Sequence, residues 1–139
     1  MDPEPILHIA AELKNLSLIR RFIQETAAAL GADRAVIADM ILATDEAVTN
    51  VIVHGYQDRP GMIEIELQRN GDAIVIYLRD ESLPFDPTSV PPPDVTQPLE
   101  ERPLGGMGIH LIRQLMDDVS HHITPQGGNE LIMTKRGID

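Results

Sequence analysis

The chain contains no cysteine and no tryptophan, and aromatic residues make up only 3% of its 139 residues. The absence of cysteine excludes a disulfide framework, a thiolate zinc site and a thiol nucleophile. The scarcity of aromatic rings argues against single-stranded nucleic-acid binding, which uses exposed rings for base stacking. Because 42% of the residues are nonetheless hydrophobic, we expect a folded domain with an aliphatic core.

Basic residues are also scarce, since 11 Lys and Arg stand against 22 Asp and Glu and give a net charge of −11. Such a surface repels DNA and RNA backbones and favours basic protein partners, so we expect no direct contact with nucleic acid. A nucleotide bound here would need a cation and backbone dipoles close to its phosphates.

Long apolar runs are missing, whereas a membrane-spanning helix needs about 20 apolar residues. The acidic start, residues 1–5, lacks the basic segment and apolar run of a signal peptide. We therefore expect a cytoplasmic protein without membrane contact. No repeat or boundary divides residues 1–139, which we expect to form a single domain.

Hydrophobic periodicity predicts the order β-α-α-β-β-loop-α-β-β. The expected strands cover residues 6–13, 62–68, 73–80, 119–124 and 130–135, and the expected helices cover 16–30, 33–55 and 109–118. Asn15 and Asp33 are expected to cap the first two helices, and Gly31 to end the first. This order predicts an α+β fold: a two-layer sandwich with one mixed, mostly antiparallel sheet covered on one face by three helices.

The segment 82–104 differs in composition, because it holds seven of the eleven prolines. A connection of this length without regular structure is typically a functional lid or a disordered segment.

Within DEAVTNVIVHGY, residues 45–56, Glu46, Asn50 and His54 recur at steps of four, opposite the apolar stripe of the helix. A solvated helix face would explain this pattern. A covered ligand site is the alternative, because Asn is a poor residue in the middle of a helix and Val53 lies on the same side. There the carboxamide oxygen could bind Mg²⁺ and the carboxylate could accept a proton.

Two further motifs have the same ambiguity. Asp80 ends an apolar strand, where it could form a turn or accept a hydrogen bond from an exocyclic amino group such as that of adenine. Gly105-Gly106-Met107-Gly108 precedes a helix, where it could form a simple turn or bring backbone N–H groups to phosphates. No strand directly precedes the glycines, so a dinucleotide fingerprint is excluded, and the P-loop pattern is absent.

Histidine-based metal binding is not expected, because His121 and His122 are adjacent on a predicted strand and face opposite ways.

Taken together and in this order, the motifs resemble those of the anti-sigma-factor serine/threonine kinases. This bacterial family belongs to the ATPase superfamily of gyrase, heat-shock chaperones and histidine kinases, which has the Bergerat ATP-binding fold. DEAVTNVIVHGY is similar to the family's N box, RDESLPFDP to its first glycine box, GGMGIHLIRQLMDDVSH to its second, and GGNELIMTK to its closing hairpin. The resemblance covers residues 6–136.

The resemblance implies a role for each matching residue. Glu46 would be the general base, Asn50 would ligate Mg²⁺ that bridges the ATP phosphates, and Asp80 would bind the adenine amino group. The glycine-box residues implied to bind the nucleotide are Gly105, Gly106, Met107 and Gly108. Arg102 is implied to lie near the γ-phosphate or the partner protein. The implied substrate is a serine or threonine of an anti-anti-sigma (STAS-domain) protein, the second partner is a sigma factor or equivalent regulator, and the implied assembly is a homodimer.

One position departs from the family pattern. Ser82 stands where the first glycine box has a glycine, and its Cβ could crowd adenine or restrict a turn with positive φ. A non-catalytic, partner-binding regulator with weak or lost ATP binding is therefore the alternative to a kinase, and an ATPase without a protein acceptor is a third possibility.

Overall fold

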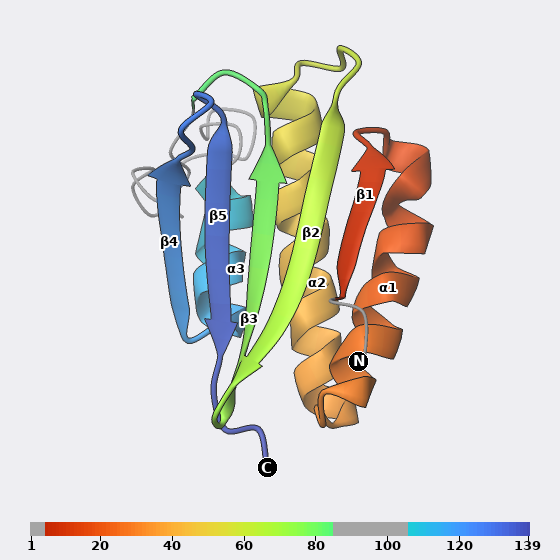
Figure 1. Ribbon diagram of the computed structural model, residues 1–139, viewed down its shortest axis with the longest axis vertical. Coiled ribbons are helices and arrows are strands. Elements are labelled where there is room, and N and C mark those ends of the chain that lie inside the picture. The colour runs from red at the N-terminus through yellow and green to blue at the C-terminus, as the bar shows by residue number, and fades with distance from the viewer. Residues whose placement is uncertain (1–4, 85–105) are drawn as a thin grey trace.

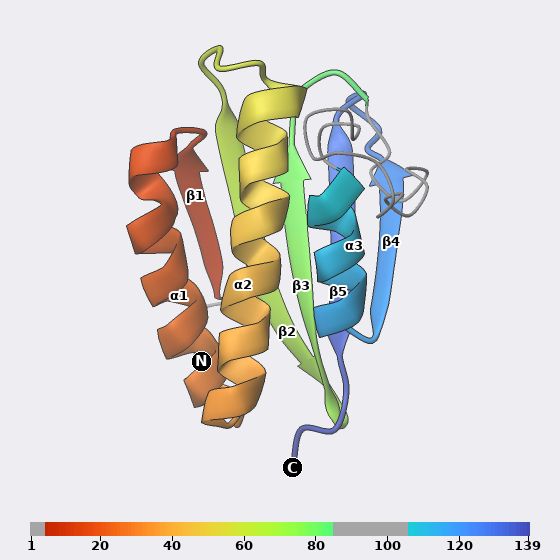
Figure 2. The same cartoon turned by 180° about the vertical axis from the view of Figure 1, so that it is seen from behind.

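The computed structural model describes residues 5–84 and 106–139. Its five strands form one sheet in the order β1-β2-β3-β5-β4. Three helices cover one face of this sheet and leave the other face open (Figure 1, Figure 2). The expected α+β sandwich is confirmed, and every pairing between the described strands is antiparallel.

The elements follow the predicted order. They are β1 (Ile6–Ala10), η1 (Leu13–Asn15), α1 (Leu16–Ala29), α2 (Arg34–Asn50), η2 (Val51–Gly55), β2 (Met62–Asn70), β3 (Ala73–Asp80), α3 (Gly106–Leu115), β4 (Asp118–Ile123) and β5 (Asn129–Lys135). Among the described helices, none is long and apolar enough to cross a membrane.

The prediction that Asn15 caps the first helix is wrong. Its side chain makes no capping hydrogen bond, and its Nδ2 instead donates to the carbonyl oxygen of Ala10 at 2.9 Å. This bond spans a short turn after β1, and the strand ends at Ala10 rather than at the predicted Leu13. The third helix is also displaced from its prediction, because it begins at Gly106 and ends at Leu115.

The second helix begins as predicted. Asp33 has extended backbone dihedrals, and its Oδ1 accepts a hydrogen bond from the N–H of Val36 at 2.9 Å. Such a cap satisfies one of the N–H groups that the first helical turn leaves unpaired. Gly31, with φ of 99°, occupies the left-handed conformation that commonly follows a helix end.

The core lies between the helices and the inner face of the sheet, and it is aliphatic as the composition predicted. Its largest fully buried side chains are Ile19, Ile23, Met40, Ile63, Ile65, Leu67, Ile74, Ile76, Leu78, Ile109, Ile112 and Met133. Lys135 fastens β5 to both neighbouring helices, since its Nζ donates to Asp39 Oδ2 at 3.0 Å and to the carbonyl oxygen of Leu115 at 2.6 Å.

The outer face of the sheet carries a charged cluster centred on Arg79. Its Nη1 contacts Glu64 at 2.6 Å and Glu66 at 2.8 Å, and its Nε contacts Glu130 at 2.7 Å. These contacts join β2, β3 and β5. Burial raises the pKa of Glu66, but hydrogen bonds from Gln68 and Arg79 outweigh it and hold this pKa below its ordinary value.

We expect Arg79→Met to lower the free energy of unfolding at pH 7 by roughly 1–3 kcal/mol, because it leaves Glu66 buried without its cation. A carboxyl whose folded pKa is depressed stabilises the fold above its unfolded pKa, near 4.5, and loses this contribution as pH falls through the folded value. The difference in free energy of unfolding between the native protein and Arg79→Met should therefore shrink below pH 4.5, as measured by urea unfolding across pH. Arg21→Met, which breaks only the exposed pair with Glu25, is the matched control and should cost at most about 0.5 kcal/mol. An equal, pH-independent loss in both variants would contradict this account.

Candidate functional site

A pocket lies between the C-terminal end of α2, helix α3 and the inner face of the sheet. Its empty volume is about 410 Å³, including space open to solvent, and it is lined by Ala47, Asn50, Val51, Gly55, Asp80, Ser82, Ile112, His121, Asn129 and Leu131. The structure thus brings together Asn50 and Asp80, which the sequence singled out on separate elements.

Asp80 is buried at the end of β3, with 6% of its surface exposed. Its Oδ1 accepts three hydrogen bonds: from the N–H of Ser82 at 2.9 Å, from the Ser82 hydroxyl at 2.5 Å and from Asn129 Nδ2 at 3.1 Å. Oδ2 receives no hydrogen bond from the residues that the structure describes. The carboxylate is therefore anchored by one oxygen, and the other remains available to a ligand in the pocket.

Asn129, which lies in the predicted closing hairpin, is buried beside Asp80. Its Nδ2 also lies 3.2 Å from Ser82 Oγ and 3.2 Å from the carbonyl oxygen of Leu83. All these neighbours are acceptors, so the amide nitrogen must face them and Oδ1 must face His121 Nε2, at 2.8 Å. His121 Nε2 therefore carries a proton and donates. The cross-strand register that pairs Asp80 with Asn129 would have revealed this contact, but the register requires knowing that β5 adjoins β3.

Ser82 fits the pocket because its neighbour across the site is Gly55. A Cβ at Gly55 would lie 2.6 Å from Ser82 Oγ and 3.2 Å from Ser82 Cβ. Ser82 does not have a positive φ; among the described non-glycine residues, only Gln57 and Asp58 do. The conformational strain that the sequence suggested for this position is therefore absent.

A π-helical turn, Val51–Gly55, continues α2 directly after Asn50. The N–H of Tyr56 donates to the carbonyl oxygen of Val51 at 2.8 Å, five residues back. Single π turns inside α-helices are frequent at functional sites. The wider turn interrupts the spacing of four along the helix, and His54 does not line the pocket.

Tyr56 fastens the end of this turn to the sheet. Its hydroxyl donates to the carbonyl oxygen of Met62 at 2.7 Å and accepts from the N–H of Glu81 at 2.9 Å. Burial raises the pKa of the Tyr56 phenol above its ordinary value, so the hydroxyl remains protonated at neutral pH. Tyr56 thereby fixes the distance between Gly55 on the helix side and Asp80 on the sheet side.

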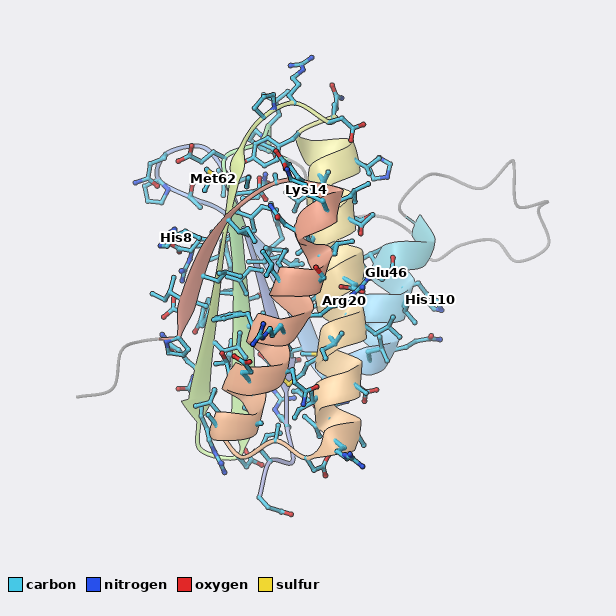
Figure 3. The ribbon with its side chains drawn as sticks, turned by 90° about the vertical axis from the view of Figure 1, so that its right-hand side faces the viewer. His8, Lys14, Arg20, Glu46, Met62 and His110 are labelled. Atoms are coloured by element: carbon cyan, nitrogen blue, oxygen red, sulfur yellow. The ribbon has the colours of Figure 1, made fainter. Side chains whose placement is uncertain are left out.

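Glu46 lies one helical turn before Asn50 and is partly exposed. Figure 3 shows it on the side of α2 that points away from the sheet. It does not line the pocket. The neighbouring Asp45 is bound by Arg20 of α1 through Nε and Oδ2 at 2.8 Å.

Residues 9–135 match the histidine kinase-like ATPase domain family. The chain belongs to this family.

Curated relatives of this ATPase domain include the serine-protein kinase RsbW of Bacillus cereus strain Q1, 32% identical over 133 residues, and that of strain G9842, 33% identical over the same length. Each alignment covers 93% of this chain and 82% of the relative. The crystal structure of the RsbU and RsbW domains of Rv1364c from Mycobacterium tuberculosis has the same fold, with a TM-score of 0.64 and 24% identity. That match covers 96% of this chain and 33% of the Mycobacterium chain.

ATPase domains of this family imply ATP, generally with Mg²⁺, and the residues of the pocket fit both. The Asn50 side chain faces the pocket and makes no hydrogen bond with any described residue, so its amide oxygen can serve as a ligand. Mg²⁺ bound with a nucleotide commonly takes one or two protein ligands and several phosphate oxygens and waters. The absence of three clustered His, Asp or Glu groups among the described residues is compatible with that mode.

Three further predicted site residues belong to α3. Gly106, Met107 and Gly108 form its first turn, and Ile112, one turn further on, lines the pocket. Arg102, Gly105 and nearly all of the predicted lid lie outside the described residues.

We expect Gly55→Ala to lower the free energy of unfolding by about 1–3 kcal/mol, because the new methyl group overlaps Ser82. In a Ser82→Gly background the same change should be neutral or stabilising, since alanine is the better helix former. Chemical unfolding of the four proteins in this double-mutant cycle measures the coupling. As a control, a second cycle pairs Gly55→Ala with Ser120→Gly, at an exposed position on β4, and should show no coupling. If Gly55→Ala costs the same free energy of unfolding in every background, Ser82 and Gly55 do not meet.

Proposed function

We propose that this protein is an ATP-dependent serine/threonine kinase that acts as an anti-sigma, partner-switching regulator. Its substrate would be a serine or threonine of an anti-anti-sigma (STAS-domain) protein, and its second partner a sigma factor or equivalent regulator. The observation that carries the proposal is the meeting of Asn50 and the anchored Asp80 in one pocket of a histidine kinase-like ATPase domain. The names of the relatives, serine-protein kinases, support it.

In this proposal the pocket positions the nucleotide from both ends. Asp80 Oδ2 would accept a hydrogen bond from the adenine amino group, and Asn50 would hold Mg²⁺, which neutralises phosphate charge. The backbone N–H groups of residues 105–108 would bind phosphate oxygens at the positive end of the helix dipole. Arg102 would lie near the γ-phosphate or the partner protein. Local neutralisation of this kind is required because the chain as a whole is strongly acidic.

Glu46 would act at the edge of this site. As the substrate hydroxyl oxygen forms its bond to the γ-phosphorus, the bond between that phosphorus and the bridging oxygen of ADP breaks, and Glu46 takes the hydroxyl proton. Phosphoryl transfer depends on positioning and charge stabilisation more than on covalent catalysis, so no nucleophilic side chain of the enzyme is required.

We also propose that the protein works in the cytoplasm as a homodimer and makes no direct contact with nucleic acid. The acidic composition supports protein partners with basic surfaces rather than a phosphate backbone.

Glu46→Gln should lower the rate of phosphate transfer to a purified STAS-domain protein from the same genome by about 10²–10⁴-fold, the usual contribution of a general base. The affinity for Mg-ATP should stay within about twofold of the native value, because Glu46 does not line the pocket. Radiolabel transfer from ATP and calorimetry give the two readouts. Glu25→Gln, on the exposed side of α1, is the matched control. The proposal is refuted if Glu46→Gln transfers phosphate as fast as the native protein, or if the native protein transfers none. Steady release of phosphate without a protein acceptor would indicate an ATPase.

A non-catalytic regulator is the second candidate, and the Ser82 hydroxyl inside the pocket is the observation that favours it. In that case the native protein should not bind ATP in calorimetry, and Ser82→Gly should restore binding.

A further inference from the structure

Three donors converge on a single oxygen of Asp80: the N–H of Ser82, the hydroxyl of Ser82 and the side-chain amide of Asn129. The Ser82 hydroxyl donates to Asp80 Oδ1 at 2.5 Å, and Asn129 donates to both Asp80 Oδ1 and Ser82 Oγ, at 3.1 and 3.2 Å. These three side chains are 6% exposed or less, so water competes little with their contacts. We refer to Ser82 and Asn129 as the Asp80 clamp.

We propose that the Asp80 clamp determines purine specificity: Ser82 and Asn129 fix the carboxylate so that Oδ2 can serve only the exocyclic amino group of a 6-aminopurine. This inference rests on the proposed nucleotide site. It gives Ser82, the residue that departs from the family pattern, a function in recognition instead of a role as an obstruction.

The chemistry of purines explains why a fixed carboxylate would discriminate. A 6-aminopurine presents an N–H donor at position 6, which a carboxylate oxygen accepts. A 6-oxopurine presents an acceptor there and carries its donor on the neighbouring ring nitrogen. A carboxylate that can rotate could move to that donor, whereas one held by three hydrogen bonds cannot do so without losing them. A rigid Asp80 carboxylate therefore makes a weak preference for 6-aminopurines over 6-oxopurines into a strong one.

His121 takes part as a positioning residue. Its Nε2 donates to Asn129 Oδ1 at 2.8 Å, and this bond orients the carboxamide so that Nδ2 faces Asp80. Without that bond, the amide of Asn129 could turn over and bring its oxygen against the carboxylate. The Asp80 clamp therefore depends on three strands, because Asp80 lies in β3, His121 in β4 and Asn129 in β5.

The test is calorimetric titration of the full chain with Mg-ATP and with Mg-ITP, whose base carries a 6-oxo group. We expect the native protein to bind ATP roughly 10–100-fold more tightly, as the loss of one hydrogen bond to a charged group predicts. Ser82→Ala, which removes only the hydroxyl, and Asn129→Ala should each reduce this ratio about tenfold. Ser120→Ala and Asn70→Ala, at exposed positions, are the matched controls and should leave the ratio unchanged.

The outcomes separate this inference from the proposed function. If the native protein binds neither nucleotide, both are wrong. If it binds ATP but Ser82→Ala and Asn129→Ala keep the native ratio, only the clamp is wrong. A purely structural role would weaken ATP and ITP equally, so the ratio is the decisive quantity. Should Asn129→Ala fail to fold in circular dichroism, Ser82→Ala alone decides the outcome.

Discussion

The site is organised around the carboxylate of Asp80, a charged group buried at the end of a central strand. Burying such a group without partners would cost several kcal/mol, so the surrounding chain has to supply donors. Ser82 comes from the turn after β3 and Asn129 from the start of β5. Gly128, just before β5, allows this strand to approach β3, because a Cβ at Gly128 would lie 2.2 Å from the Asp80 carbonyl oxygen. The need to supply donors to the buried Asp80 carboxylate therefore determines both the backbone geometry and the polarity of one wall of the pocket.

The opposite wall depends on the end of α2, where the helix widens into a π turn. The widening carries Gly55 up to Ser82, and Tyr56 then ties the turn to the sheet through two hydrogen bonds. Asn50, the last residue before the π turn, is left facing the pocket with its carboxamide uncommitted to any described residue. A regular helix would have kept His54 in line with Asn50, so the local irregularity selects which polar residues reach the site.

The sequence predicted the order of the elements, a mostly antiparallel sheet covered on one face and the Asp33 cap, because each depends on local patterns of hydrophobicity, turn residues and capping. It also singled out Asn50, a poor residue for the middle of a helix, and Asp80 at a strand end, and the structure brings both into one pocket. It could not predict the contacts of Asn129 or Gly55, since these depend on which strand lies beside β3 and on the path of the chain after Asn50. Asn15 misled for a related reason: a capping side chain looks the same in sequence whether it bonds to its own helix or, as here, to the strand before it.

The placement of Glu46 bears on which reaction the site can perform. Asn50 faces the pocket, whereas Glu46, one turn earlier, lies outside it on the partly exposed side of α2. A base that served only a water molecule would work best in an enclosed position, where bulk solvent is excluded. A base that serves a side chain of another protein must be reachable from outside while the nucleotide remains bound. If Asp80 accepts the purine and Glu46 is the base, as we propose, the division between a carboxylate inside the pocket and one outside it favours a protein hydroxyl over water as the phosphoryl acceptor.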